Sequence, residues 1–564
     1  MRKDLYTNGS VDLPKITKKR SFFDLSHSSH IDMNPGILYP VDQVIEIVPG
    51  DTFDYSHKLN IRMTNPPKTP VMDQLVLDLY FFFCPNRIVW TNWDNFITDF
   101  SGSNYYTNFG GSYPTIQVNQ LANGNTALFY SVLDFLGWTP SNIYAGNASL
   151  NPSLLPVRGY YLIWNEFFRF APLQYPIAID TNDTSMPDTL INPGGLSYYT
   201  LASSDSTNGY TAYSTVKYAG LSLMPVNRLP GFFSRCLPQP TINDVLINLS
   251  IPSSFSGSLS PVQGLFNADP GYDDHLITTS NPGVSYGSFV ASDISVYNAG
   301  TREALLGFNN LYGGSIRDLS NAFALNKFLY IDNVYGKRIT DWTYGHFGVN
   351  VPDSRVQRPE FLAKKRVYIN INQIMQSSET GTSPQGNAGA WSQTFDEGFD
   401  FVKSFTEYGF LFTLGCIRVL NHTFSQGIDL HWRYRTRYDY YLPEFNNVGD
   451  MAIQKSAIYV DPSYNSTFGY QERYAQYKMI PSRVAGYMRP QVSNTLAIWT
   501  YTDYYNTAPT LSASWMFEPK GNIERTMYIN FSTAPGFILD YVADIKAYRS
   551  MPYNSLPGGL TGSW

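Results

Sequence analysis

The sequence predicts a mainly β protein, an eight-stranded jelly roll (a β-sandwich or barrel) with long loop insertions and a few short helices. Aromatic residues make up 16% of the 564-residue chain and charged residues only 15%, and 36 prolines and 42 glycines accompany them. This composition is typical of sheets joined by long turns. Because strand-like segments occur near both ends of the chain, we expect residues 41–564 to form one sheet-on-sheet domain closed by both ends.

The most strongly patterned segment is residues 71–100. One face of the strand predicted at 75–85 is wholly apolar and the other becomes apolar toward its end, which is typical of a central strand. Pro85 cannot donate a backbone hydrogen bond and ends the strand. Helical spacing then predicts a short amphipathic helix lying on a sheet, with its apolar face made by Val89, Trp93, Phe96, Ile97 and Phe100.

Other strands are predicted on both sides of this segment. Residues 41–48 alternate apolar and polar side chains, and a turn at Pro49, Gly50 and Asp51 leads into residues 52–63. Strands return after Lys403, beginning with residues 411–420, which are apolar on both faces. Further strands are predicted at 428–438, 496–502 and 527–531.

Insertions separate the early strands from the late ones. Residues 101–156 are predicted to form the first insertion, with a short helix in the apolar patch 128–138. A second amphipathic helix is predicted at 158–170. Residues 177–314 are the least patterned part, and a structureless stretch of this length is usually functional or disordered. A capping box at Ser315 and Asp318 starts a helix to about Tyr335, within a helical and loop excursion over 315–400.

Charge and cysteine content limit the possible functions. A net charge of −6 argues against a general nucleic-acid coat, so any contact with a polyanion must be local. Cys84, Cys236 and Cys416 are odd in number and lack Cys-x-x-Cys spacing, which predicts buried thiols. Residues 1–14 contain no apolar signal region, and no run reaches about 18 apolar residues. We therefore expect neither a secretory signal nor a membrane span, and folding in a cytoplasm.

Residues 1–40 are predicted to be a basic arm. Its cationic side chains exceed the acidic ones and little in the first 24 residues can be buried, so the arm is either a solvated tail or a segment that contacts nucleic acid or a neighbouring subunit. The arm contributes six candidates for nucleic-acid contact, namely Arg2, Lys3, Lys15, Lys18, Lys19 and Arg20.

Three further candidates for nucleic-acid contact are Arg433, Arg435 and Arg437, which alternate with Tyr434, Thr436 and Tyr438. On a strand, this alternation places three guanidinium groups on one face. Basic groups interleaved with aromatic rings suit single-stranded DNA, because bases stack on the rings while arginine meets phosphate. Ion pairs with Asp429, Asp439 or carboxylates of a neighbouring subunit are an equally good explanation.

The sequence predicts no catalytic residue, no metal site and no cofactor. Residues 283–287 fit G-x-S-x-G, but Asn281 and Pro282 precede them and no helical face follows, so a Gly/Ser loop is the better interpretation. His27 and His30, near Asp24 and Asp32, are interpreted as surface polar residues, since a zinc site needs a tighter ligand set. His346 is predicted to be a satisfied buried or interface histidine. No pair of carboxylates stands out as an acid/base pair.

Several runs together resemble the major capsid protein of microviruses, the small icosahedral single-stranded-DNA bacteriophages, and in particular the gokushovirus-like branch. The order and spacing of these runs match from end to end. They include residues 20–27, 49–53, 403–407 and 551–553. The side chains that carry the resemblance are Phe81, Phe82, Phe83, Pro85, Arg87, Trp90, Trp93, Trp164, Asn165, Glu166, Arg169, His346, Phe347, Arg358, Pro359, Glu360, Tyr470, Gln471, Glu472, Arg473 and Tyr474.

The resemblance implies a non-enzymatic virion protein, assembled in a bacterial cytoplasm, whose sixty copies close a T=1 shell around a circular single-stranded DNA genome. It also implies a host-facing protrusion at the threefold axes, for which 177–314 is the candidate, and partners that include scaffolding, pilot and small DNA-binding viral proteins and a host surface receptor. Residues 229–238 depart from the family pattern. The rival hypothesis is a β-sandwich carbohydrate-binding or glycan-cleaving protein, because exposed Tyr and Trp also stack on sugars.

Overall fold

The structure is a computed structural model. It describes residues 20–98, 112–116, 129–138, 152–186, 221–240, 316–335, 338–375, 377–379, 388–446, 449–460 and 466–553. The chain divides into two compact units, one made of residues 1–241 and 332–564 and the other of residues 242–331. Within the second unit, the described residues are those of helix α5 (Ile316–Tyr335) up to Ile331.

Two antiparallel sheets form the framework of the first unit. The first sheet has the order β1-β16-β5-β10-β9, with β2 also paired to β16, and the second has the order β7-β3-β11-β6-β8, with β4 also paired to β11. The strands of the first sheet are β1 (Ser21–Asp24), β2 (His27–Met33), β5 (Thr52–Met63), β9 (Ile371–Met375), β10 (Ala388–Ser404) and β16 (Phe537–Arg549). Those of the second are β3 (Ile37–Pro40), β4 (Ile45–Ile47), β6 (Leu75–Pro85), β7 (Met224–Pro225), β8 (Glu360–Ile369) and β11 (Gly409–Val419).

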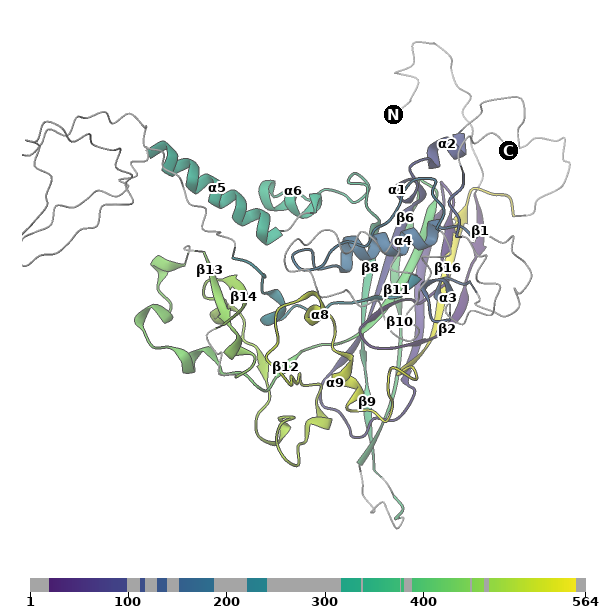
Figure 1. Cartoon of the computed structure of the whole chain (residues 1–564). Helices are drawn as coiled ribbons and strands as arrows, with labels where there is room; N and C mark the ends of the chain where they lie inside the picture. The colour runs from purple at the N-terminus through teal and green to yellow at the C-terminus, as the bar shows by residue number, and fades with distance from the viewer. Residues whose placement is uncertain are drawn as a thin grey trace, which may run out of the picture. The chain divides into compact units, whose positions relative to one another are not determined.

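The chain passes between the two sheets in the manner of a jelly roll. If the short neighbours β1 and β2 count as one position, β3 and β4 as another, and the short edge strands β7 and β9 are left out, the first sheet reads β2-β16-β5-β10 and the second β3-β11-β6-β8. Eight strand positions in two four-stranded sheets of this order are those of a double Greek key. Figure 1 shows β6, β8, β10, β11 and β16 running alongside one another. The predicted mainly β fold is confirmed.

The inner faces of the two sheets share one core. Tyr55 on β5 contacts Phe81 on β6 and Phe401 on β10, with ring centroids 5.2 and 5.3 Å away. The Tyr55 hydroxyl also lies 3.3 Å from Thr413 Oγ1 on β11 and 3.2 Å from the Tyr541 hydroxyl on β16. Side chains from three strands of one sheet and two of the other therefore meet in this core, and all but Thr413 are aromatic.

Strands from the two ends of the chain pair with each other in the same sheets, as the sequence predicted. Strand β16 pairs with β5 from Phe537 opposite Met63 to Tyr548 opposite Thr52, and it pairs with β1 and β2 on its other side. Strand β11 lies between β6 and β3. The central position predicted for 75–85 is confirmed, and so are the strands at 52–63 and 411–420.

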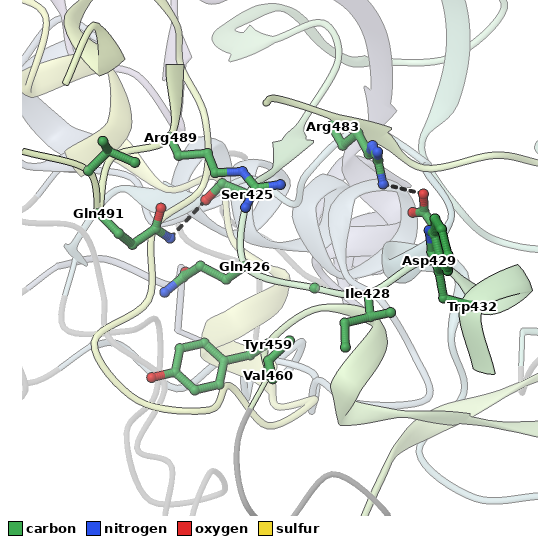
Figure 2. Close-up of a pocket in the computed structure, with 12 residues that line it drawn as sticks. Ser425, Gln426, Ile428, Asp429, Trp432, Tyr459, Val460, Arg483, Arg489 and Gln491 are labelled. Carbon is green, nitrogen blue, oxygen red and sulfur yellow. Dashed lines mark hydrogen bonds and ion pairs between the residues drawn. The ribbon is translucent and has the colours of Figure 1, made fainter. Parts of the chain in front are cut away.

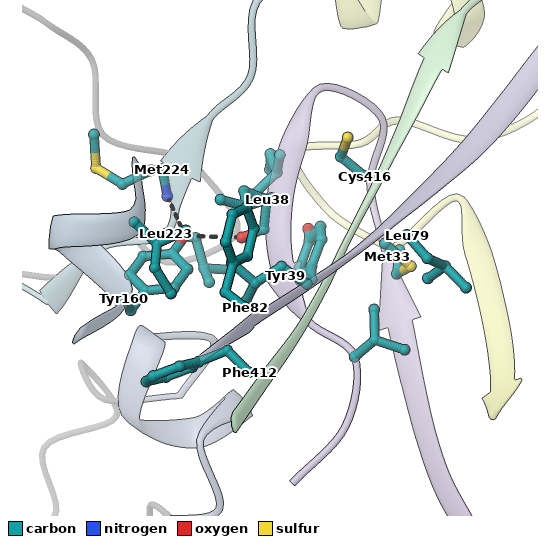
Figure 3. Packing of buried hydrophobic residues seen from close by; sticks show 14 of the residues in the cluster. Met33, Leu38, Tyr39, Leu79, Phe82, Tyr160, Leu223, Met224, Phe412 and Cys416 are labelled. Atoms are coloured by element: carbon teal, nitrogen blue, oxygen red, sulfur yellow. Dashed lines mark hydrogen bonds between the residues drawn. The ribbon is translucent and has the colours of Figure 1, made fainter. Parts of the chain in front are cut away.

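Helices cover the outer face of the second sheet, which explains why β6 is apolar on both faces. Phe82 points away from the first sheet and packs on Phe167, with ring centroids 4.7 Å apart. Gly159 faces Phe412 so closely that an added Cβ would lie 2.8 Å from its ring. The covering elements are α1 (Asn86–Val89), α3 (Val132–Phe135), α4 (Leu155–Ile163) and a π-helical turn (Trp164–Phe168). The single helix predicted after Pro85 is instead two short ones, and the second, α2 (Trp93–Thr98), has no buried residue, with Phe96 and Ile97 exposed. Figure 3 shows Tyr160 of α4 bridging Leu38 and Met224, whose backbone groups bond its hydroxyl at 2.8 and 3.0 Å.

A second apolar cluster holds the turns and short strands between β11 and β16. Its buried members include Phe232, Phe233, Phe468 and Trp515. The short strands are β12 (Thr423–Phe424), β13 (Asp450–Gln454), β14 (Thr467–Glu472) and β15 (Ser482–Arg483). The short helices of the body are α6 (Ile339–Phe347), α7 (Ala475–Lys478), α8 (Ala513–Met516) and α9 (Lys520–Glu524). The 3₁₀ turns are Phe233–Arg235, Leu430–Arg433, Arg437–Asp439, Pro443–Phe445, Lys455–Ala457, Gly486–Met488 and Ala497–Trp499.

Several predicted boundaries differ from the structure. Residues 21–40, expected in the arm, form β1, β2 and β3, and residues 360–400 of the expected excursion supply β8, β9 and most of β10. Residues 221–237 of the expected insertion are packed into the body, with Leu221 and Met224 buried. The strands predicted at 496–502 and 527–531 are a 3₁₀ turn and an irregular segment.

The helix predictions agree better. Helix α5 covers the segment expected after the capping box, and α4 with its π-helical turn covers most of 158–170. The three cysteines are buried free thiols, as predicted. No helix in the described ranges is long and apolar enough to cross a membrane.

Candidate nucleic-acid and assembly surfaces

Of the six basic residues predicted in the arm to contact nucleic acid, the structure describes Arg20 alone. Arg2, Lys3, Lys15, Lys18 and Lys19 lie outside the described residues. Arg20 is exposed just before β1, and its Nη1 donates a hydrogen bond to Thr52 Oγ1 at 3.2 Å. The Arg20 guanidinium therefore lies on the surface at the start of the first sheet.

The prediction of a strand at residues 428–438 is wrong. The segment forms two 3₁₀ turns, Leu430–Arg433 and Arg437–Asp439. At the second turn, Asp439 accepts hydrogen bonds from the backbone N–H groups of Arg435 and Thr436 at 2.8 and 2.7 Å. Asp439 and Thr436 complete a capping box. Such local side-chain bonds satisfy backbone donors that a strand would have paired with a neighbour.

The three arginines of this segment consequently have different surroundings. Arg433 donates from Nη1 to Gln454 Oε1 at 2.6 Å and to Ser456 Oγ at 2.7 Å, and burial lowers the pKa of its guanidinium. Arg435 and Arg437 are exposed. The Arg437 guanidinium lies 5.0 Å from the centre of the Tyr438 ring, which is also exposed. Arg435 and Arg437 thus remain candidates for phosphate contact, whereas Arg433 joins its turn to the end of β13 and the turn that follows it.

The motif residues of β6 and the following turns serve the framework. Phe81, Phe82 and Phe83 are buried, and β6 ends at Pro85. Arg87 forms an ion pair with Glu407 through its Nε. The indole N–H of buried Trp90 donates a hydrogen bond to Asp183 Oδ1 at 2.7 Å, and the Trp93 ring packs on the Trp90 ring. In the π-helical turn, Trp164 Nε1 donates to the Pro225 carbonyl at 2.8 Å, and the Asn165 side chain bonds both the carbonyl and the N–H of Ile177.

Most of the remaining motif residues make similar structural contacts. Glu166 is half-buried, and Arg169 Nη1 donates to the Gln174 carbonyl at 2.7 Å. His346 Nε2 lies 2.9 Å from Asp332 Oδ1, and the neighbouring Phe347 is exposed. Arg358, followed by Pro359, pairs with Asp353 at 2.7 Å and lies over the Phe167 ring, and Glu360 pairs with Lys403. On β14, the backbone of Tyr470 forms hydrogen bonds with the backbone of Leu237, and the Gln471 side chain donates to the Phe232 carbonyl. Glu472 forms an ion pair with Lys478. After the strand, the Arg473 guanidinium lies over the Phe445 ring, and Tyr474 adopts a left-handed backbone conformation with φ 65°.

The histidines considered as metal ligands do not come together. His27 Nε2 lies 2.9 Å from Asp42 Oδ1, whereas His30 Nδ1 lies 3.0 Å from Asp540 Oδ1 on β16. Within the described ranges, no group of three or more His, Cys, Asp and Glu side chains could hold a metal ion. The G-x-S-x-G segment lies outside these ranges.

The sequence interpretation missed two buried charge clusters. On the second sheet, Asp78 of β6 bonds Arg366 of β8 at 2.6 and 2.9 Å and also bonds Arg418 of β11. In the second cluster, Asp503 pairs with Arg228, and His422 Nε2 lies 3.1 Å from Glu518 Oε2. A lone aspartate in the apolar run of β6, with arginines on two later segments, was the available signal for the first cluster.

The second charge cluster should make the fold sensitive to alkaline pH. Burial lowers the pKa of His422, but Glu518 and Asp503 outweigh burial and Arg228 and raise the pKa to about 9, above the ordinary value of 6.5. The folded subunit therefore holds this proton more tightly than the unfolded chain, so the stabilisation is complete below pH 6.5 and is lost as the pH rises through 9.

We expect the free energy of unfolding of soluble subunits to fall by roughly 3 kcal/mol between pH 6.5 and 9 through His422. Urea titrations at several pH values measure this change. His27, whose bond to Asp42 likewise raises its pKa to about 9, titrates in the same window, so the comparison is with the variant His422→Gln. A pH dependence equal in the two proteins would contradict the assignment to His422.

The sequence was compared with protein families and with known proteins. A family model described as capsid protein (F protein) matches residues 12–559. The chain belongs to this capsid protein family. Proteins named capsid protein VP1 are similar over nearly their whole length. That of Chlamydia phage 1 is 30% identical, with 98% of this chain and 97% of the relative covered. That of Bdellovibrio phage phiMH2K is 29% identical (97% and 97%), and that of Spiroplasma virus 4 is 28% identical (96% and 95%).

The resemblance to microvirus major capsid proteins is therefore confirmed. This capsid protein is a structural component of a phage virion that assembles into a multi-subunit shell, not an enzyme. The motif residues fit that role, because those described above pack, hydrogen-bond or cap the framework.

Proposed function

We propose that this capsid protein forms a T=1 shell of sixty copies around a circular single-stranded DNA genome. The observation that supports the proposal best is the match to the capsid protein family over residues 12–559, together with a rigid two-sheet framework closed by both ends of the chain. A closed shell needs several different contact patches on one subunit, and long excursions from a rigid framework can supply them.

The outer face of the first sheet provides one such patch. Phe395 and Phe399 on β10 are 71% and 62% exposed, and Val402 on the same strand and Tyr548 on β16 are exposed as well. Apolar surface of this kind is typical of protein interfaces. We propose that these side chains are covered by neighbouring subunits in the assembled shell.

Contact with the genome would be local and independent of base sequence. The arm residues named above, with Arg20, Arg435 and Arg437, carry the charge for it. Since the whole chain is acidic, such contacts are weak and depend strongly on salt concentration. Scaffolding, pilot and small DNA-binding viral proteins are further proposed partners.

Host attachment is proposed for the insertion, through a protrusion at the threefold axes that meets a host surface receptor. The insertion proposed here is shorter than the sequence indicated, because Leu221, Leu223 and Val226 are buried in the body. The proposed host-facing segments are residues 187–220 and 241–315, both outside the described residues.

Electron microscopy of the expressed protein tests the proposal. We expect uniform closed particles that contain nuclease-resistant DNA when genome is present. Replacing Phe395 and Phe399 together by Ser should abolish particles while leaving the subunit folded, because both side chains already face solvent. The matched control on the same strand is Phe401→Ala, which should lower the free energy of unfolding by about 3–5 kcal/mol because Phe401 lies in the core. A wild-type monomer that stays stable under all assembly conditions, scaffolds included, would contradict the proposal.

A further inference from the structure

A cavity of about 540 Å³ opens on the surface between residues 425–429, the 3₁₀ turn Leu430–Arg433, residues 459–460 and the segment 483–492. Its size is within the range of small-ligand sites, roughly 300–1,000 Å³. Figure 2 shows Arg483 and Arg489 on one side and Gln426 and Tyr459 on another. The full lining is Ser425, Gln426, Gly427, Ile428, Asp429, Trp432, Tyr459, Val460, Arg483, Arg489, Gln491 and Val492.

The charged groups of the cavity leave one cation free. Arg483 Nη1 pairs with Asp429, so these two charges compensate each other. Arg489 is exposed, and its guanidinium makes no hydrogen bond or ion pair with any residue that the structure describes. The cavity therefore carries one uncompensated positive charge, on a group whose planar donors suit phosphate oxygens.

An aromatic platform lies in the same cavity. Trp432 is 67% exposed, although an indole of this size is usually largely buried. The 3₁₀ turn that replaced the predicted strand holds it there, with the Trp432 N–H donating to the Asp429 carbonyl at 3.2 Å. An exposed indole with one open face can stack on a nucleobase.

We propose that this cavity binds one nucleotide of single-stranded DNA, with the base stacked on Trp432 and the phosphate on Arg489. The inference extends the proposed genome contact and rests on it. A neutral sugar would use the indole but not the free guanidinium, and a peptide would need unpaired backbone groups along an edge. An aromatic face and a lone cation that line the same cavity favour the nucleotide. Most of the polar lining is already engaged: Gln426 bonds the backbone of Tyr505 through both ends of its amide, and Gln491 Nε2 donates to Ser425 Oγ at 3.0 Å. The site would therefore accept any base.

Fluorescence anisotropy of a labelled oligothymidine with soluble subunits tests the proposal over a series of salt concentrations. Trp432→Ala should weaken binding about tenfold, and Trp432→Phe, which keeps an aromatic face, should stay within about threefold of wild type. Arg489→Gln should lower the slope of log affinity against log salt by about 0.7, the contribution of one phosphate contact on a single strand.

Matched controls lie on the framework. Trp391 is an exposed tryptophan on β10 and Arg62 an exposed arginine on β5, both outside the cavity, so Trp391→Ala and Arg62→Gln reproduce the losses of aromatic area and charge. Equal effects in the controls, an unchanged slope for Arg489→Gln, or binding of a neutral oligosaccharide without binding of oligothymidine would overturn the proposal. Circular dichroism spectra of each variant are compared with that of the wild type to check that the variant is folded. Particle formation is scored separately by sedimentation, so a failure of shell assembly is distinguishable from a failure of this site.

Discussion

Replacing Asp78 by Ala should destabilise the folded subunit by about 3–5 kcal/mol, the typical cost of leaving a buried charge without its partner. The Asp78 carboxylate is buried between β8 and β11, where it bonds Arg366 and Arg418, with Lys364 Nζ 3.7 Å away. Burial raises its pKa, but these cations more than compensate and lower it below its ordinary value. In the variant, the guanidinium of Arg418, itself only 8% exposed, would remain in the sheet without this carboxylate.

Urea unfolding of soluble subunits measures the effect. The control is Glu360→Gln, which removes a partly exposed pair with Lys403 at 2.7 Å and should cost less than about 1 kcal/mol. The double variant Asp78→Leu with Arg418→Met should recover most of the loss, because replacing a buried pair by apolar side chains of similar volume is often neutral. A cost for Asp78→Ala as small as that for Glu360→Gln would show that the cluster does not hold the three strands together.

The same cluster shows where prediction from sequence succeeds and where it stops. Strands β6 and β11 could be predicted because their apolar residues form long unbroken patterns. Strand β8 could not, because Lys364, Lys365 and Arg366 are consecutive and resemble a solvated segment. Their partners, Asp78 and Asp396, belong to β6 and β10, so the reason why these charges can occupy a sheet lies in tertiary structure.

The candidate sites show the same limit. The alternation of Arg433, Arg435 and Arg437 has the period of a strand, yet one carboxylate, Asp439, takes the backbone donors of two residues and turns the chain. Local hydrogen bonding outweighs a short periodic pattern. The preceding turn, Leu430–Arg433, places Arg433 against Gln454 and Ser456 and leaves Trp432 in the cavity. The sequence thus identified the composition of this surface, basic and aromatic, but not its geometry.

Deleting residues 197–295, the larger part of the insertion predicted from sequence at 177–314, should abolish folding. That deletion removes β7, which pairs with Ile37 and Leu38 of β3, and it removes the buried side chains Leu221 and Met224. Leu223, Val226, Phe232 and Phe233 are also buried, so six large apolar side chains leave the core. At about 2–5 kcal/mol each, these losses total roughly 12–30 kcal/mol, against the 5–15 kcal/mol by which a folded domain is usually stable. The departure from the family pattern at 229–238 lies in this same packed segment, where Phe232 and Phe233 are buried.

Deleting residues 242–310 and bridging them with a short flexible linker should instead give a folded subunit. This deletion keeps 221–240 and leaves both parts of the first compact unit intact. Lengthening or shortening a loop changes its closure entropy only slightly. If the insertion carries host attachment, particles of this variant should fail to adsorb to host cells, whereas their sedimentation should match that of shells with a correspondingly smaller subunit. Soluble folded protein from the 197–295 deletion would contradict the role assigned to β7, and complete loss of folded protein from the 242–310 deletion would contradict a peripheral insertion.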